Sequence, residues 1–535
     1  MTSRITAARF SATLMLFAAL LSCSSVQRPA STATDYDVIV VGSGLGGLSA
    51  ATHLAVGGLE VLALEQHHKV GGMATSFERG DFVFDVALHE MSLGAGEGSL
   101  IESLEQAGIR DRVELIRVPE LYRAVYPDFE FTLDSDHDRA MQTLCERWPD
   151  ECEGLHAYDE VLQTIHDDII ALRDLHRSAP ITAALIKLTV PLRQPTLFHY
   201  RDATVEQLLD ENLDDEQLEA VLASFWPYYG PPPSRMFAPT FALATRSYMA
   251  NGAWLVKGTA QALSDAYRER IEELGGEVRT GVRVASIDLN DGRVAGVTTE
   301  AGESITAHYV VSNADPFQTF NDLVGEENTP RDAKEMLEEF ETANSLAGVY
   351  LGLDVEASFW DIDDYEIFYF SGLDADAMYE AAMEGRWEEG FISMTFYSNL
   401  DPDTYAPPGK SVLVLNTYSE IDAWPERGEG YQQHKSDMMN RLIAMAEKLL
   451  PGLSEHIEVQ EGMTPRTIAR YTLQHDGVPY GWDCTPEQKM RMPNTTEIEG
   501  LYLAGSWTVP FHGVSVAQLS GHKAARLLLE EIAED

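Results

Sequence analysis

A buried apolar run, a glycine turn, a helix and a second apolar run follow one another near the start of the chain. Residues 38–41, Val-Ile-Val-Val, have the continuous apolar character of a strand covered on both faces, and the strand is expected over 36–41. Residues 45–56 read as a helix that ends at Gly57-Gly58, a pair suited to a helix C-terminus. Residues 61–64 are apolar again and predict a second strand over 60–64. We therefore expect a strand–helix–strand unit here.

The turn between that strand and helix carries three glycines with separate physical roles. Gly42 permits the tight turn, Gly44 lets backbone N–H groups approach a pyrophosphate, and Gly47 lets the helix pack close to the strand. The helix N-terminus attracts phosphate through its unpaired amides and its dipole. Glu65, directly after the second strand, is placed to accept ribose hydroxyl hydrogen bonds. The unit therefore predicts a dinucleotide site.

Later segments alternate between helical and strand patterns, with no internal repeat. Apolar spacing predicts helices over 140–172, 205–225, 261–274 and 434–450, and another beginning near Val514. Strands are expected over 282–289, 309–312, 345–353 and 411–417. Asn290-Asp291-Gly292 predicts a hairpin turn.

Four further motifs resemble one family of flavoenzymes. Residues 65–77 resemble the E-x5-G-G extension of the FAD-dependent amine oxidase superfamily. Residues 80–89 resemble the G-x-x-F-D-x-G-x-H run of its phytoene desaturase, carotenoid isomerase and retinol saturase-like branch. Residues 464–482 and 501–515 resemble elements near the C-terminus of that branch. Met73 stands where amine oxidases commonly have arginine, which argues against the amine oxidases proper.

The resemblance implies an α/β fold: a Rossmann-like FAD-binding domain assembled from discontinuous segments, with an inserted α+β substrate domain. We expect the FAD-binding domain over 35–90, 253–320 and 462–535, and the substrate domain over 91–252 and 321–461. FAD is the implied cofactor. The residues expected to bind it are Gly42, Ser43, Gly44, Leu45, Gly46, Gly47, Glu65, Gln66, Gly71, Gly72, Met73, Ala74, Val284, Gly505, Ser506, Gly513, Val514 and Ser515.

The resemblance also implies a function: oxidoreduction at carbon–carbon double bonds of an apolar polyene or isoprenoid lipid, by hydride transfer at flavin N5. Saturation, desaturation and isomerisation all fit, with an unknown electron donor or acceptor. The alternatives are an amine or amino-acid oxidase, and a non-turnover flavoprotein that binds a polyene. Because flavin carries the redox step, no side chain is required for it. His89 and Tyr480 are candidate catalytic residues, and Tyr480 with Trp482 could form an aromatic wall or core packing. Arg466 and Arg470 read as structural or as anchors for a carboxylate.

The composition is strongly acidic, with 86 Asp and Glu against 38 Lys and Arg and a net charge of −48. Such a surface repels nucleic acid and is typical of a solvated, halophile-type exterior. The hydrophobic fraction of 44% is that of a folded chain. Residues 226–263 contain no acid, which indicates either buried core or an apolar substrate or membrane-facing wall.

The N-terminus predicts export. Arg4 and Arg9 precede an apolar run over 10–21 that is too short to span a bilayer, as in a signal peptide. Leu20-Leu21-Ser22-Cys23 resembles a bacterial lipobox, in which Cys23 becomes lipidated. Residues 1–23 are then the signal and 24–34 a flexible tether. We expect a membrane-anchored lipoprotein outside the cytoplasm, or a secreted or periplasmic protein if Cys23 is not lipidated.

The other cysteines are Cys145, Cys152 and Cys484. No C-x-x-C pair is present, so neither a zinc site nor a redox dithiol is signalled. Cys145 and Cys152 are seven residues apart on an expected single helix, where they lie beyond disulfide reach. We expect both to be core thiols.

Overall fold

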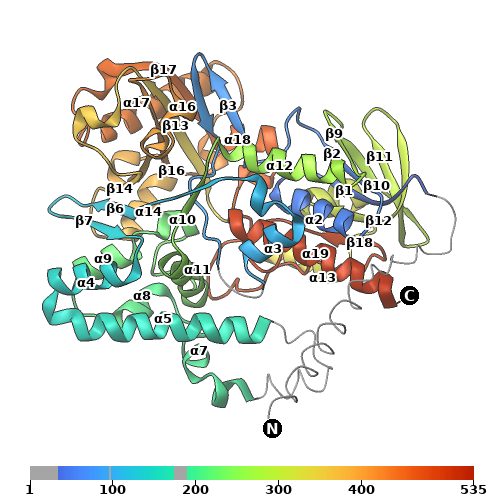
Figure 1. The fold of residues 1–535 in the computed structure, drawn as a ribbon, viewed down its shortest axis with the longest axis horizontal. Helices are drawn as coiled ribbons and strands as arrows, with labels where there is room; N and C mark the ends of the chain where they lie inside the picture. The colour runs from blue at the N-terminus through green and yellow to red at the C-terminus, as the bar shows by residue number, and fades with distance from the viewer. Residues whose placement is uncertain (1–33, 95–97, 174–188, 535) are drawn as a thin grey trace, which may run out of the picture.

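Two seven-stranded sheets organise the molecule, each in its own half of the ribbon shown in Figure 1. The computed structural model describes residues 34–94, 98–173 and 189–534. The first sheet runs in the order β10-β11-β12-β1-β2-β9, with β18 paired to β12. The second runs in the order β17-β13-β16-β15-β14-β6-β7.

The first sheet is assembled from three separated parts of the chain. Its strands are β1 (Tyr36–Val41), β2 (Val61–Glu65), β9 (Glu277–Thr280), β10 (Val284–Asn290), β11 (Arg293–Thr299), β12 (Ser304–Ser312) and β18 (Leu501–Leu503). β1 pairs in parallel with both β2 and β12, and β10 and β11 form the expected hairpin. The predicted strand–helix–strand unit is present, because α2 spans Leu45–Val56 between β1 and β2.

Both faces of this sheet are buried, which explains the unbroken apolar runs of its strands. Val38 and Val40 pack with the helices α2, α12 (Ala260–Glu273) and α19 (Val514–Glu534). Ile39 and Val41 point the other way, into a layer that contains Phe320 and several tryptophans. The alternation follows from the period of two in a strand.

Helices α2 and α19 meet at a backbone contact that only glycine allows. A Cβ atom at Gly521 would lie 2.0 Å from the Gly46 carbonyl oxygen and 2.8 Å from the Ala50 nitrogen. Because both neighbours are backbone atoms, neither can move aside without a helix shift. The C-terminal helix is thereby held against the first turn of the N-terminal one.

The second sheet is mainly antiparallel and lies among most of the remaining helices. Its strands are β6 (Glu120–Val125), β7 (Glu130–Asp134), β13 (Ser345–Leu353), β14 (Glu366–Phe370), β15 (Phe391–Thr395), β16 (Ser411–Ser419) and β17 (Ile457–Met463). Strands β13 and β16 match the predicted ranges closely. Strands β6 and β7 lie in a stretch that apolar spacing describes as mostly helical.

The remaining elements are two small ribbons and a set of helices. The ribbons pair β3 (Ser76–Arg79) with β4 (Phe82–Asp85), and β5 (Leu115–Arg117) with β8 (Trp254–Val256). The other α-helices are α3 (Leu100–Ala107), α4 (His137–Arg147), α5 (Cys152–Arg173), α7 (Pro195–Tyr200), α8 (Val205–Asp210), α9 (Glu216–Ala223), α10 (Trp226–Tyr229), α11 (Ala238–Asn251), α13 (Arg331–Glu339), α14 (Ala375–Met383), α15 (Tyr397–Leu400), α16 (Pro402–Tyr405), α17 (Glu429–Ala446) and α18 (Pro465–Thr472). None of the described helices is long and apolar enough to cross a bilayer.

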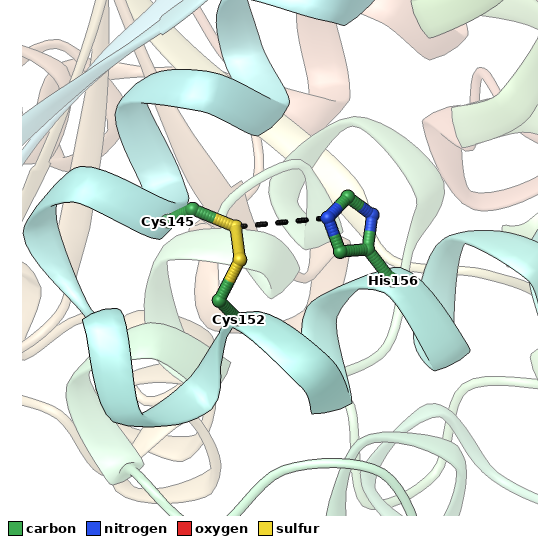
Figure 2. A group of neighbouring side chains, drawn as sticks. All are labelled: Cys145, Cys152 and His156. Carbon is green, nitrogen blue, oxygen red and sulfur yellow. Dashed lines mark hydrogen bonds between the residues drawn. A yellow bond between two sulfur atoms is a disulfide. The ribbon is translucent and has the colours of Figure 1, made fainter.

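The expectation of two core thiols was wrong, because Cys145 and Cys152 form a disulfide. The predicted helix over 140–172 is interrupted: α4 ends at Arg147, a short 3-10 turn begins at Pro149, and α5 starts at Cys152. This corner brings the two Cα atoms to 4.8 Å, within the range of a disulfide. Figure 2 shows His156 facing the bonded sulfurs, with its Nε2 4.0 Å from Cys145 Sγ.

The helix contact predicts a large effect of one methyl group. We expect Gly521→Ala to destabilise the protein by about 1–3 kcal/mol, as overpacking typically does, and to lower its thermal unfolding midpoint. Gly430→Ala is the matched control, because its Cβ would meet nothing within 4 Å inside exposed α17. Equal unfolding midpoints for the two variants would contradict the tight contact.

Candidate functional site

The glycine turn after β1 has the geometry of an anion-binding helix terminus. Gly42 adopts a φ of +88°, which favours glycine. Gly44 caps α2 without any side-chain hydrogen bond, and the first amide to bond back is that of Leu48, to Gly44 O at 2.9 Å. A Cβ at Gly47 would lie 2.1 Å from the Gly42 carbonyl oxygen. The helix therefore packs closely and leaves its first amides unpaired for a ligand.

Glu65 is buried at the end of β2 and held by the turn itself. Its Oε2 accepts hydrogen bonds from the backbone and the hydroxyl of Ser43, both at 2.8 Å. Its Oε1 accepts from the His67 amide at 2.8 Å. A carboxylate has about four acceptor sites, so this one retains capacity for a ligand hydroxyl. Ser43 thus orients Glu65 and points away from the cavity.

The second glycine pair crosses over the first turn. The Gly71 amide donates to Ser43 O at 2.8 Å, and Gly71 and Gly72 both have positive φ. A Cβ at Gly72 would lie 3.2 Å from the Gly44 Cα atom. Two backbone segments therefore run close together where an extended dinucleotide would pass.

Asn313, directly after β12, is a site residue that the sequence reasoning missed. A Cβ at Gly44, Gly46 or Gly505 would lie 2.8, 2.6 or 2.8 Å from its side-chain amide. The side-chain amide of Asn313 lies between the glycine turn after β1 and the segment that follows β18. Its position at the end of a predicted buried strand was the one available signal.

A single cavity of about 980 Å³ joins these segments to the second sheet. The predicted cofactor residues that line it are Gly42, Gly44, Leu45, Gly46, Glu65, Gln66, Gly71, Gly72, Met73, Ala74, Val284, Gly505, Ser506, Gly513 and Val514. Ser43, Gly47 and Ser515 do not line it; the Ser515 hydroxyl donates to Ser92 O at 2.7 Å instead. The structure thus gathers predicted residues from three distant segments around one space.

One part of the cavity lining is aromatic and polar and contains no Asp, Glu, Lys or Arg. We call this part the inner wall. It consists of the lining residues contributed by the segment after β4, by α10, and by β13, β15 and β16: Val86, Ala87, His89, Pro227, Tyr228, Leu346, Tyr350, Phe391, Ser393, Asn416, Thr417 and Tyr418. None of these is Asp, Glu, Lys or Arg. The inner wall can contact an apolar ligand through rings and hydroxyl groups.

His89 is the titratable imidazole of the inner wall. Its Nδ1 lies 2.8 Å from the Thr395 hydroxyl and 3.1 Å from the Tyr397 hydroxyl, and its Nε2 lies 3.1 Å from the Asn416 side-chain nitrogen. Burial lowers the pKa of His89 to about 4, so the ring is neutral at neutral pH. A neutral imidazole can accept a proton at one nitrogen and release one from the other.

The other aromatic and arginine candidates lie in different places, some at the cavity and some in the core. Tyr480 lines the cavity, and burial raises its pKa to about 12, which keeps its hydroxyl protonated. Trp482 lies in the core, packed against Phe317, Phe340 and Trp507, so it forms no cavity wall. Arg466 pairs with Glu426 and donates to Trp424 O, which is a structural role. Arg470 lines the cavity.

Known proteins share the fold, and curated relatives share about a quarter of the aligned residues. A family model described as flavin containing amine oxidoreductase matches residues 45–529. The chloroplastic prolycopene isomerase of Arabidopsis thaliana is 28% identical over 93% of this chain and 83% of that protein. The all-trans-retinol 13,14-reductase of Danio rerio is 26% identical over 88% of this chain and 82% of that protein. An oxidoreductase structure from Methanosarcina mazei superposes with a TM-score of 0.60 at 16% identity, covering 92% of this chain and 100% of that one.

The glycine geometry fits FAD. Unpaired helix amides can hold the pyrophosphate, Glu65 can accept ribose hydroxyls, and the Gly71-Gly72 crossing leaves the room that a longer dinucleotide needs. The N-terminus of α19, behind Gly513 and Val514, can stabilise negative charge on a bound flavin.

A test of Glu65 follows from its three acceptor bonds. We expect Glu65→Gln to weaken FAD binding by about 1–3 kcal/mol, because the amide presents donors where the carboxylate accepts. Titration of the apoprotein with FAD, followed by flavin fluorescence, measures the change. Glu78→Gln is the control, since Glu78 is an exposed carboxylate on the same cavity. Equal affinities in the two variants would contradict the assigned role of Glu65.

Proposed function

The chain belongs to the family of flavin containing amine oxidoreductases, and we propose that it uses FAD to act on carbon–carbon double bonds of an apolar polyene or isoprenoid lipid. The observation that carries this proposal is the nearly uncharged inner wall, continuous with the FAD segments in one cavity. The named activities of the prolycopene isomerase and the retinol reductase support the same substrate class.

The amine oxidase alternative has less support from the relatives than the polyene does. The inner wall offers a protonated amine aromatic rings but no carboxylate counter-ion. The carboxylates that line the cavity are Glu65, Glu78, Asp315 and Glu461, and none belongs to the inner wall. An apolar polyene needs no such counter-ion. Hydride exchange with the substrate is the chemistry that bound FAD supplies.

We also propose that the protein works outside the cytoplasm, anchored to a membrane by a lipid on Cys23. Cys23 lies outside the described residues, so the proposal rests on the lipobox-like sequence. The Cys145–Cys152 disulfide supports it, because disulfides persist in oxidising compartments. A lipid anchor would hold the enzyme beside an apolar substrate.

The anchor is tested by one substitution. We expect wild-type protein in a bacterial host to take up labelled fatty acid and to sediment with membranes, and Cys23→Ala to do neither. Ser25→Ala, within the tether, is the control that should behave as wild type. Fatty-acid labelling that persists in Cys23→Ala would contradict lipidation at this residue.

The substrate class is tested by anaerobic mixing of the FAD-loaded protein with retinoids and carotenoids. Bleaching of oxidised flavin by the lipid indicates desaturation. A blue shift of polyene absorbance that requires prior flavin reduction indicates saturation, whereas altered geometry without net redox change indicates isomerisation. Unchanged polyenes in both flavin states, together with peroxide formation from amines in air, would contradict the proposal and favour the amine oxidase alternative.

A further inference from the structure

A chain of hydrogen bonds connects the inner wall to a carboxyl group behind it. His89 Nδ1 lies 2.8 Å from Thr395 Oγ1, and the Thr395 hydroxyl lies 2.7 Å from Glu366 Oε2. His89 lines the cavity, whereas Thr395 and Glu366 do not. The second sheet fixes this order, because Glu366 on β14 is the register partner of Thr395 on β15. The imidazole therefore stands between the cavity and a buried acid.

The acid is held in a site that favours its protonated form. Glu366 is 1% exposed, and its side chain interacts with the hydroxyls of Thr395 and Tyr228. Burial outweighs these contacts and raises the pKa of Glu366 to about 8. Neither oxygen of the buried Glu90 has a hydrogen-bond partner among the described residues, and burial and the nearby Glu366 raise the pKa of Glu90. Burial therefore favours the protonated form of both carboxyls.

No cation of the described chain forms an ion pair with either carboxyl. The titratable groups that interact with Glu366 are His89, Glu90, Tyr228, Tyr365 and Tyr397, and Glu90 also interacts with Tyr229 and Tyr248. Burial keeps these tyrosines protonated by raising their pKa values above the usual range. Glu366, whose pKa burial raises to about 8, can supply or take up a proton near that pH.

Donors and acceptors can be assigned along this chain in two consistent ways, and the two assignments differ by one bound proton. With Glu366 ionised, the Thr395 hydroxyl donates to Glu366, His89 Nδ1–H donates to Thr395, and Nε2 accepts from the Asn416 amide. With Glu366 protonated, every donor reverses: Glu366 donates to Thr395, Thr395 donates to Nδ1, and Nε2–H faces Asn416. The second arrangement needs the Asn416 amide turned over, so that its oxygen accepts.

We propose that Glu366, Thr395 and His89 form a proton relay. The relay exchanges a proton with one carbon of the substrate double bond, while the other carbon exchanges hydride. This inference rests on the proposed function. In saturation, bound reduced FAD would supply hydride to one carbon of the double bond, and His89 Nε2 would supply the proton that the other carbon takes up. The Thr395 proton then moves to Nδ1 and the Glu366 proton to Thr395, leaving Glu366 ionised. One hydride and one proton add across the bond, and desaturation runs the same steps in reverse.

The relay makes the rate depend on the ionisation of Glu366. In single-turnover measurements with preloaded FAD, we expect the pH–rate profile of wild type to contain a sloping limb near pH 8. The limb falls toward high pH for saturation, because Glu366 loses the proton it must donate, and rises for desaturation. Glu366→Gln and Thr395→Val should each remove the limb and slow the step by about 100-fold or more, the usual contribution of general acid–base catalysis. Thr395→Ser should restore both.

Infrared spectroscopy of the holoprotein supplies a readout that does not depend on turnover. Two carbonyl bands of protonated carboxyls should disappear as the pH rises through 7 and 8 in wild type and in Thr395→Val, one from Asp85, whose pKa burial raises to about 7, and one from Glu366. The Glu366 band alone should be missing in Glu366→Gln. Glu90→Gln is the matched control, because it replaces a protonated carboxyl by a neutral amide outside the relay. It should keep the kinetic limb.

The possible failures point to different conclusions. Wild-type protein that leaves every polyene unchanged in both flavin states contradicts the proposed function, and the relay falls with it. Normal turnover with an unchanged limb in Glu366→Gln and Thr395→Val contradicts the relay alone. A Thr395→Val enzyme that keeps the wild-type rate while Glu366→Gln loses it would overturn the route through Thr395.

Discussion

The close approach of backbone segments around Gly46 is the constraint on which the rest of the structure depends. The Gly46 carbonyl oxygen would lie 2.0 Å from a Cβ at Gly521, and a Cβ at Gly46 itself would lie 2.7 Å from the Gly505 backbone. Side chains larger than that of glycine are excluded at Gly46 and Gly521, because the backbone atoms of neighbouring segments are in direct contact there. The space that we assign to FAD is therefore bounded by main chain from three segments, which offers amide donors in fixed positions at little entropic cost.

The second sheet contributes chemistry of a different kind to the same cavity. Its inner strands present rings, hydroxyls and amides to the inner wall, while Glu366 on β14, the pairing partner of Thr395, is a buried acid behind it. An ionised carboxylate is unfavourable in low-dielectric surroundings, so burial favours the protonated form of the buried acid. The ionisable carboxyl group thus lies one layer behind the inner wall. Residues of the inner wall contact the ligand, and the carboxyl group behind them exchanges protons.

Local patterns predicted the part of the site that is local in sequence. The strand β1, the helix α2 and Glu65 follow from spacing and glycine positions alone, whereas the Gly71-Gly72 pair was identified by its resemblance to a family motif. Asn313 and Glu366 could not be recognised this way, because their roles arise from packing between segments hundreds of residues apart. The Cys145–Cys152 disulfide was missed for a local reason: apolar periodicity continued across a corner beginning at Pro149. Domain boundaries and the cofactor-binding roles of individual residues remain predictions.

The contact between α2 and α19 has a consequence for how the protein is made. Translation proceeds from the N-terminus, so α2 leaves the ribosome hundreds of residues before the helix that must pack on it. The cofactor site cannot close until α19 has been synthesised and has packed on α2. Capture of FAD therefore follows the synthesis of α19. For a protein that leaves the cytoplasm, either the chain folds around FAD before it crosses the membrane, or FAD must be present on the far side.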